Sequence, residues 1–143
     1  MPLVAWPAST IVECACKDAA LELTGAPRAQ FYCHCEDCQV VHGAACVPVA
    51  LYLASSVKVV RGVLGSWQLK TTSRRTCVTC GLRLFAEPND LVRGVTATLL
   101  PSGRFQPAFH INCDSARLPV RDALPHYRRL PARMGGSDQI VEW

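Results

Sequence analysis

The sequence predicts a mainly β protein, because short stretches of alternating apolar and polar residues recur between turn signals and only one stretch favours a helix. Turn residues recur about every 8–12 positions, which is typical of a sandwich or barrel of short strands. Half of the 143 residues are apolar and 18% are charged, as in a globular chain. The length predicts a single domain over residues 1–143, with a core of about 12–131 and an irregular C-terminal tail.

The expected strands are the stretches in which apolar and polar side chains alternate. They cover residues 20–24, 44–54, 57–62, 65–72, 82–86, 92–100 and 109–113. Residues 39–43 favour a short helical turn that ends at Gly43. Residues 1–11 show no periodic pattern and are expected to form a leader, and prolines and arginines beyond Leu118 predict an irregular tail.

Two stretches carry more specific expectations. Residues 11–16 are extended in character, and side chains at i and i+2 of a strand share a face. Cys14 and Cys16 are therefore expected to present both sulfurs to one side. The stretch 44–54 is strongly apolar, with Ala45, Val47, Val49, Leu51 and Leu53 on one parity, so at least one face of this strand is expected to be buried.

Seven of the nine cysteines lie in three clusters, which read Cys14-Ala15-Cys16, Cys33-His34-Cys35-Glu36-Asp37-Cys38 and Cys77-Val78-Thr79-Cys80-Gly81. Short spacings hold pairs of thiolates about one coordination sphere apart, as a soft divalent metal requires. The last cluster has the form of a zinc-ribbon knuckle, in which two thiolates close on one metal across a tight turn. Either the first pair or the central cluster could complete that tetrahedron.

Seven ligands divide into one closed four-cysteine site and one site with three protein ligands. A structural zinc has four protein ligands, whereas a catalytic zinc keeps one position for water or substrate. Alternatively, Cys46, Cys113 or a histidine closes the second site, and both metals are then structural. The odd number of cysteines and the lack of a visible secretory signal disfavour a disulfide framework and predict a reducing, cytoplasmic compartment.

The formal net charge of +4 counts every cysteine as neutral. Seven thiolates subtract seven charges and two Zn²⁺ ions add four, which leaves +1. This correction removes most of the electrostatic argument for a nucleic-acid partner. No apolar run approaches the roughly 20 residues that span a bilayer, so no membrane association is expected.

The ordered motifs are Cys14-x-Cys16, Tyr32-Cys33-His34-Cys35-x-x-Cys38, Cys77-x-x-Cys80-Gly81-x-x-Leu84-Phe85, Phe109-His110-Ile111 and Leu124-Pro125. From about residue 12 to residue 131 they resemble the glutathione-dependent formaldehyde-activating enzyme (GFA) family, of which centromere protein V is a relative. The sequence departs from the family at Lys17, where members usually carry glycine, which leaves the local turn open.

The resemblance implies a β-tent fold of short antiparallel strands that is stapled by a structural zinc. The ligands of that zinc would be the outer cysteine pairs, Cys14, Cys16, Cys77 and Cys80. A second zinc, which family members can lose or replace, would lie on the central cluster, Cys33, Cys35 and Cys38. The family reaction is the reversible addition of the glutathione thiol to formaldehyde, which is carbon–sulfur lyase chemistry.

If this activity holds, an open zinc position would bind the glutathione sulfur and lower its pKa, and the thiolate would add to the aldehyde carbon. No proton donor for the resulting alkoxide is evident. His34 lies beside a ligand cysteine on an extended stretch and is expected to point away, in a packing or surface role. His110 is expected to make structural hydrogen bonds rather than to act in catalysis.

The remaining candidate residues have simpler expected roles. Cys46 is expected to be a small buried apolar side chain, and Cys113 either has no role or reaches a metal. His42 and His126 are assigned to the surface or the core. Arg74 and Arg75 could bind glutathione carboxylates or lie in a solvated loop. The tail arginines are expected to keep the tail soluble; they are Arg128, Arg129 and Arg133.

Two other functions remain open on the sequence. One is a zinc-stabilised binding module whose metals only hold the fold, as in a centromere protein V-like or nucleic-acid-binding relative. Its support is small, since no basic tail or aromatic-rich face is present. The other is redox work by the central cysteines, which requires an accessible thiol of low pKa rather than a metal-bound one.

Overall fold

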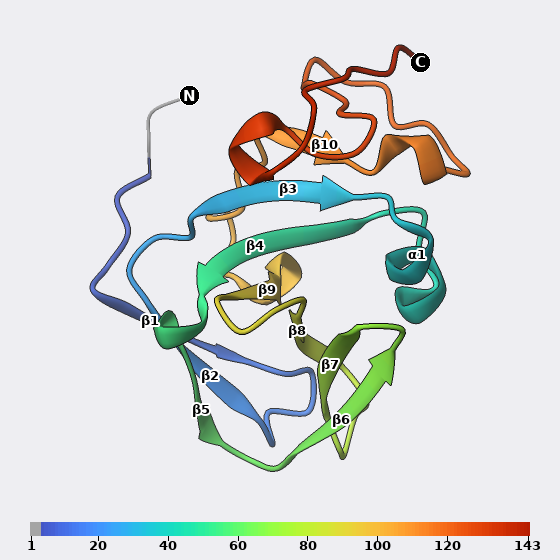
Figure 1. Cartoon of the computed structure of the whole chain (residues 1–143). Coiled ribbons are helices and arrows are strands. Elements are labelled where there is room, and N and C mark those ends of the chain that lie inside the picture. The colour runs from blue at the N-terminus through green and yellow to red at the C-terminus, as the bar shows by residue number, and fades with distance from the viewer. Residues whose placement is uncertain (1–3) are drawn as a thin grey trace. The chain divides into compact units, whose positions relative to one another are not determined.

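The computed structural model describes residues 4–143 and is mainly β, as the sequence predicts (Figure 1). The strands are β1 (Ser9–Glu13), β2 (Ala20–Thr24), β3 (Ala29–Cys33), β4 (Val47–Leu53), β5 (Val57–Arg61), β6 (Leu64–Leu69), β7 (Thr72–Cys77), β8 (Arg83–Glu87), β9 (Val92–Thr96) and β10 (Phe109–Ile111). The helical segments are α1 (Glu36–His42) and 3₁₀ turns at Ala54–Ser56, Ala97–Leu99, Cys113–Ser115 and Ala132–Met134.

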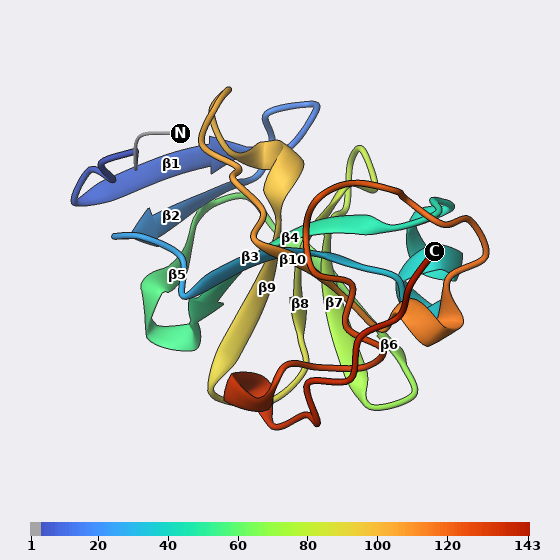
Figure 2. The ribbon, with the colours of Figure 1, turned by 90° about the horizontal axis from the view of Figure 1, so that it is seen from above.

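The part of the chain that contains β1, β2 and β5–β9 forms two sets of antiparallel strands. Strands β1, β2 and β5 form a three-stranded sheet in that order, and β1 and β2 lie side by side in Figure 2. Strands β6, β7, β8 and β9 are consecutive neighbours in a second sheet. Successive strands are joined by short turns, so this part of the chain forms a meander.

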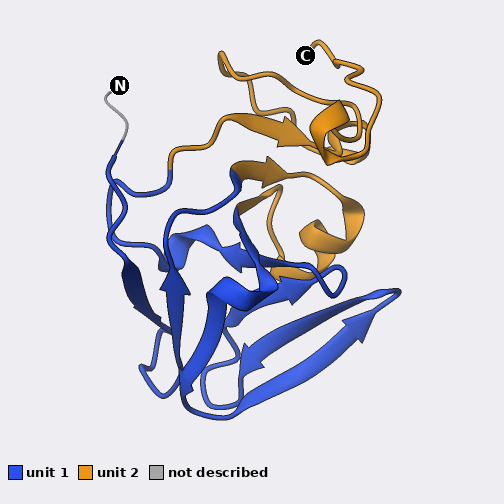
Figure 3. Ribbon diagram, turned by 60° about the vertical axis from the view of Figure 1, so that its left-hand side comes forward, with its two compact units in different colours: residues 1–29, 50–105 blue, residues 30–49, 106–143 orange. Residues whose placement is uncertain are grey.

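The chain divides into two compact units, which Figure 3 shows in different colours. The unit just described combines residues 1–29 with residues 50–105, and the second unit combines residues 30–49 with residues 106–143. A single domain over residues 1–143 therefore stays a prediction. Residues 1–3 of the expected leader lie outside the described part of the chain.

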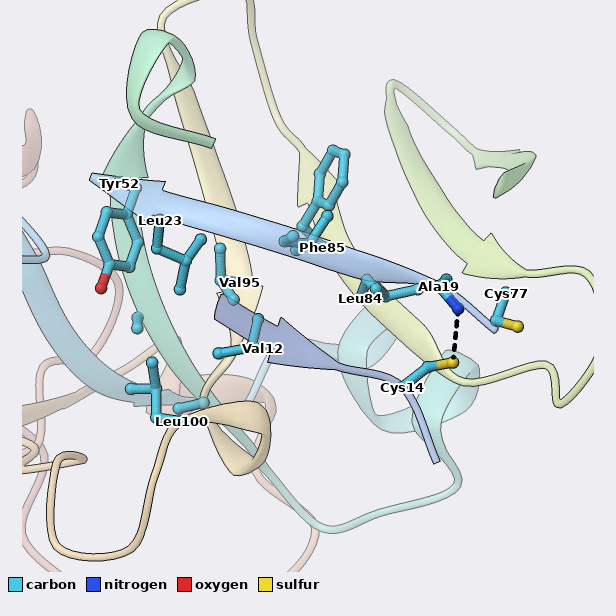
Figure 4. Packing of buried hydrophobic residues seen from close by; sticks show 13 residues of the cluster. Val12, Cys14, Ala19, Leu23, Tyr52, Cys77, Leu84, Phe85, Val95 and Leu100 are labelled. Atoms are coloured by element: carbon cyan, nitrogen blue, oxygen red, sulfur yellow. Dashed lines mark hydrogen bonds between the residues drawn. The ribbon is translucent and has the colours of Figure 1, made fainter. Parts of the chain in front are cut away.

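The apolar core of the first unit follows from the side-chain alternation of its strands (Figure 4). Leu21 and Leu23 of β2 are both fully buried, and burying one leucine side chain stabilises the fold by about 1.5–3 kcal/mol. Leu84 and Phe85 are consecutive, yet both are buried. The strand pairing explains this, because the register between β7 and β8 shifts at this point and a bulge turns both side chains to one face.

The second unit is built on β3 and β10, which pair in parallel with Phe109 opposite Phe31. The resemblance implied antiparallel strands, and this pair is an exception. Helix α1 follows β3 and ends at Gly43, whose φ of 59° supplies the left-handed cap. Gly43 therefore ends the helix as predicted, although the helix begins at Glu36, earlier than expected.

Several sequence-based boundaries are wrong. The expected strand 65–72 is two strands, because the chain turns after β6 at Lys70, whose φ is 54°. The expected strand 92–100 ends at Thr96, where a 3₁₀ turn begins. Strand β4 has a buried face, as expected, and its fully buried side chains are Ala50 and Tyr52, at even positions.

The expected extended stretch 11–16 also ends early. Strand β1 stops at Glu13, and a turn contains Cys16. Lys17 in this turn has a φ of 67°, the left-handed backbone conformation that glycine adopts most easily. The residue that departs from the family pattern therefore occupies a position where the backbone itself favours glycine.

The turn around Lys17 is tied to the end of β5. The Arg61 side chain donates hydrogen bonds to the Lys17 carbonyl at 3.1 and 2.7 Å and pairs with Glu13. The next residue, Gly62, has a φ of 85°, and a Cβ atom there would lie 2.3 Å from the Asp18 carbonyl oxygen. Glycine is required at this position both by conformation and by space.

Replacing Lys17 by glycine should relieve the strain of the left-handed conformation. We expect Lys17→Gly to raise the free energy of unfolding by about 0.5–1 kcal/mol, because the relief exceeds the entropy that glycine adds to the unfolded chain. Urea unfolding of the metal-loaded protein measures this. Lys17→Ala keeps the strain and is the control, so equal stabilities for the Gly and Ala variants would contradict the prediction.

Candidate metal centres

The outer cysteine pairs meet in the first unit. The sulfurs of Cys14 and Cys16 are 3.6 Å apart, and those of Cys16 and Cys77 are 3.7 Å apart. With Cys80 they form a group in which all sulfurs lie within 4.8 Å of one another. A zinc ion bound tetrahedrally at about 2.3 Å from each sulfur separates the sulfurs by about 3.8 Å. The spacing therefore fits a four-thiolate zinc site.

Two turns place these sulfurs. Cys14 and Cys16 belong to the turn after β1, so a turn rather than strand alternation brings them together. Cys77 ends β7, and Cys80 lies in the turn before β8. Gly81 has a φ of 74°, and its N–H donates to the Cys77 carbonyl at 2.9 Å, as expected for a knuckle.

Backbone N–H groups point at these sulfurs and favour thiolates. The Ala19 N–H donates to the Cys14 sulfur at 3.3 Å (Figure 4). Hydrogen bonds from the backbone of Leu82 and then of Cys16 lower the pKa of Cys80 to about 6. The backbone of Asp18 acts in the same direction on Cys16, but burial and the neighbouring sulfurs prevail and raise its pKa to about 12. Four thiolates so close together require a cation.

The central cysteines meet in the second unit. Cys33 ends β3, Cys35 is the N-cap of α1, and Cys38 lies in the first turn of that helix. Their sulfurs all lie within 4.8 Å of one another. Two N–H groups point at them, because the Cys38 amide donates to the Cys35 sulfur at 3.3 Å and the Asn112 side chain donates to the Cys33 sulfur at 3.5 Å.

The three central cysteines would also be stabilised as thiolates by a bound cation. The sulfurs of Cys35 and Cys38 act in opposite directions on Cys33, and the balance with burial raises its pKa to about 11. Cys33 and Cys35 together raise the pKa of Cys38 well above its usual range. The thiolates of Cys33 and Cys35 therefore oppose ionisation of Cys38. Soft thiolate ligands in this number fit a zinc ion with one further coordination position.

A chain of hydrogen-bonded side chains lies beside the central cluster. His34 Nε2 is 2.8 Å from His110 Nδ1, and His110 Nε2 is 2.8 Å from Asp122 Oδ2. Both imidazoles are fully buried. His34 therefore points into the protein and packs against the edge of Trp143, rather than lying at the surface. The structural hydrogen bonds expected of His110 are present.

When the imidazoles of His34 and His110 are neutral, their hydrogen-bond partners determine which ring nitrogen carries the proton. The Asp122 carboxylate accepts from His110 Nε2, so His110 Nδ1 accepts from His34 Nε2. Burial, and then His110 and His126, lower the pKa of His34 to about 4, which keeps this ring neutral. His34 Nδ1 is then a buried acceptor, and it has no partner within the described residues.

His126 joins Asp122 and His110 in a third group of potential ligands, all within 4.8 Å of one another. The ring of His126 stacks on that of His110, with centroids 4.3 Å apart. However, His126 Nε2 is 2.8 Å from the Val120 carbonyl oxygen, which can only accept, so this nitrogen carries a proton. The hydrogen-bonded arrangement accounts for this group without a metal.

The other sequence candidates are dispersed. Cys46 precedes β4 and is only half-buried, and Cys113 is buried at the start of a 3₁₀ turn, outside both cysteine groups. His42 ends α1. In the tail, Arg129 pairs with Asp114 at 2.8 Å, and Arg133 lies over the Phe109 ring, so two of the tail arginines have structural contacts.

Sequence reasoning missed several residues around the central cluster. Gln39 donates from its side-chain amide to the carbonyls of His34 and Ser115, at 2.7 and 2.9 Å. Asn112, with a φ of 55°, reaches Cys33. Asp122 and Trp143 lie in the irregular tail, where no periodicity marks a functional position. The Asn112 position could have been found from its place next to the His110-Ile111 motif.

Together, these features define a class of mainly β protein with one group of four cysteines and one group of three, each of which could hold a metal ion. The chain belongs to the glutathione-dependent formaldehyde-activating enzyme family, whose model matches residues 9–115. No curated protein matches it. The crystal structure of a Rhodobacter sphaeroides protein is similar, with 24% identity, a TM-score of 0.54, and coverage of 65% of this chain and 89% of that one. This likeness bears on the fold alone.

A family-level relation to glutathione and formaldehyde chemistry follows from this membership. Within residues 4–143, no helix has the length and apolar character needed to cross a membrane.

The two cysteine groups should differ in what they contribute to stability. We expect Cys80→Ser to unfold the protein at moderate temperature, because structural zinc binding contributes about 10–16 kcal/mol to folding. Cys35→Ser should lower the melting temperature by only a few degrees, because serine also caps helices well. Circular dichroism melts and metal counting by native mass spectrometry measure both effects.

Cys46→Ser is the matched control, since it removes a cysteine outside both groups. Equal losses of melting temperature in the Cys80 and Cys35 variants would contradict this division between a structural and an open site.

Proposed function

We propose that the protein is a zinc-dependent carbon–sulfur lyase that catalyses the reversible addition of a thiol, glutathione in the first instance, to formaldehyde or a related small electrophile. Family membership supports the reaction class. The observation that carries the proposal is the grouping of Cys33, Cys35 and Cys38, whose three sulfurs offer a metal fewer protein ligands than a closed site needs.

The two cysteine groups would divide the work. The closed group, Cys14, Cys16, Cys77 and Cys80, would hold a structural zinc in the first unit. The open group in the second unit would hold a labile zinc. When bound there, that ion would supply positive charge that favours the ionised form of a substrate thiol at neutral pH.

The surrounding side chains position the open group. Asn112 and the α1 backbone donate to two of its sulfurs, which restrains their direction. Gln39 and the His110 ring hold the main chain and side chain of His34, the residue between two of the cysteines. Because Gln39 and His110 are buried, they help to keep the sulfurs grouped before a metal or substrate arrives.

The reaction balances without a further reactant. The thiol sulfur forms a bond to the aldehyde carbon, the electron pair of the C=O π bond moves to oxygen, and that oxygen takes up the proton released by the thiol. The reverse reaction breaks the same carbon–sulfur bond, which makes the enzyme a lyase. The residues described here account for holding the sulfurs, and we assign no side chain as the proton carrier.

Partner and compartment follow from this chemistry. A thiol substrate and cysteines that form no disulfide within residues 4–143 fit a reducing compartment such as the cytoplasm. The small net charge that remains after metal binding gives no support to a nucleic-acid partner. A zinc-stabilised binding module of the centromere protein V type would share this fold but would show no turnover.

The test is formation of the glutathione–formaldehyde adduct, followed by NMR exchange spectroscopy with labelled formaldehyde. We expect the zinc-loaded protein to exceed the uncatalysed exchange rate, and Cys35→Ser to return it to that rate while the fold persists. Cys46→Ser should keep the activity. Exchange at the background rate with the fully zinc-loaded protein would show that this pair of substrates is wrong.

A further inference from the structure

Asn112 lies where the end of β10 meets the central cysteine cluster. Ile111, the last residue of β10, pairs with Cys33 at the end of β3, so Asn112 is the first residue beyond the paired strands. Its side-chain nitrogen, Nδ2, is 3.5 Å from the Cys33 sulfur. Because sulfur is a larger atom than oxygen, this distance exceeds the roughly 2.7–3.2 Å of an N–H···O bond. A thiolate can only accept, so the amide end of the Asn112 side chain faces the sulfur.

The backbone of Asn112 is left-handed, with a φ of 55° and a ψ of 38°. Glycine adopts this conformation most easily, and asparagine is among the few other residues that tolerate it. Main-chain hydrogen bonds hold the residue on both sides, because its N–H donates to the Arg129 carbonyl at 2.8 Å and its carbonyl accepts from the Ser115 N–H at 3.1 Å. Glycine would satisfy this backbone equally well, so the side-chain amide is what asparagine adds.

The usual role of an asparagine at the start of a helical turn does not explain this residue. Asn112 is the N-cap of the 3₁₀ turn Cys113–Ser115. At helix N-caps, asparagine is favoured because its side-chain oxygen accepts a hydrogen bond from the first turn. The Asn112 side chain makes no such capping bond. It is directed at the Cys33 sulfur instead.

The donor to Cys33 differs in kind from the donors to two other cysteine sulfurs. The Cys14 and Cys35 sulfurs each accept from a backbone N–H, that of Ala19 and that of Cys38. A backbone donor remains when the side chain of its residue is replaced. Cys33 accepts from a side chain, and a single substitution at position 112 removes this bond. The surroundings of the Cys33 sulfur therefore depend on the identity of residue 112.

We propose that Asn112 is a positioning residue that orients the Cys33 sulfur and tunes its strength as a metal ligand. This inference rests on the proposed function, in which Cys33, Cys35 and Cys38 hold an exchangeable zinc. An N–H group that donates to a thiolate draws part of the negative charge away from the sulfur. The three thiolates then repel one another less, and Cys33 donates less charge to a bound ion.

Zinc retention by two variants tests this role. Asn112→Gly keeps the left-handed backbone and removes the amide, whereas Asn112→Asp keeps the shape and places a carboxylate beside the sulfur. In competition with a chromophoric chelator, we expect the three-cysteine group to hold zinc about 10-fold more weakly in the Gly variant and about 100-fold more weakly in the Asp variant, the range for loss of a partner that supports a ligand. Cys35→Ser removes one of the three sulfurs and so identifies the release step that belongs to this group.

The absorption spectrum of the cobalt-substituted protein is a second readout. Cobalt(II) in place of the more weakly held zinc gives a band for charge transfer from sulfur to metal. Without the hydrogen bond from residue 112, the Cys33 thiolate keeps more of its charge and gives it up more easily. We therefore expect this band to move to lower energy in Asn112→Gly, a shift that a purely structural role of the side chain would not produce.

Asp138→Gly is the matched control. Asp138 is another left-handed residue of the second unit, with a φ of 61°, and its carboxylate accepts from the Ala132 N–H at 2.6 Å. The substitution removes a polar side chain from the same kind of backbone position and should leave zinc retention and the cobalt band as in the wild type. An equal loss of zinc in Asp138→Gly and Asn112→Gly, or wild-type retention and an unshifted band in both Asn112 variants, would overturn the proposal and make Asn112 a residue of the turn alone.

The same measurements separate this inference from the proposed lyase function. If Asn112→Gly weakens zinc retention and shifts the cobalt band, but the wild type never exceeds background exchange with glutathione and formaldehyde, the role of Asn112 holds and the reaction is wrong. If the wild type exceeds background exchange and Asn112→Gly keeps its zinc affinity and its cobalt band, the reaction holds and the inference on Asn112 fails.

Discussion

The closure of four sulfurs between the turn after β1 and the turn before β8 is the constraint on which the first unit depends. Cys16 and Cys77 are 61 residues apart in the chain, and their sulfurs are 3.7 Å apart. Without a cation, thiolates at this distance repel one another, so the fold of both turns and the binding of a metal are one equilibrium. The apolar core around Leu21 and Leu84 would then need only to support a geometry that a bound metal fixes.

The second cysteine group is held differently. Its sulfurs come from a strand end and one helical turn within six residues, so few long-range contacts are needed to bring them together. Long-range contacts act instead through His34, which is linked to His110 and, by way of its carbonyl, to Gln39. This arrangement suits a site whose metal is exchangeable, because the ligands stay grouped when the ion leaves.

Features that local spacing determines can be predicted from the sequence, whereas features that depend on tertiary contacts cannot. The cysteine clusters, the β class and the Gly43 helix end are all local patterns. The turn at Lys70 was missed because no glycine or proline marks it. Asp122 lies in a tail without periodicity, and its contact with His110 arises only when β3 and β10 pair in parallel beside it. Likewise, Arg75 pairs with Glu87 but Arg74 with a backbone carbonyl, since strand alternation separates neighbours that are identical in the sequence.

Gly62 shows that a residue outside the four-cysteine group can support the geometry of that group. The residue touches no sulfur, but it leaves room for the Asp18 carbonyl, and the adjacent Ala19 N–H donates to the Cys14 sulfur. A side chain at position 62 would displace the Ala19 amide and weaken its hydrogen bond to the Cys14 sulfur. If the four-cysteine group holds a metal, an inherited change at Gly62 would weaken its retention, although none of the four sulfurs had been altered.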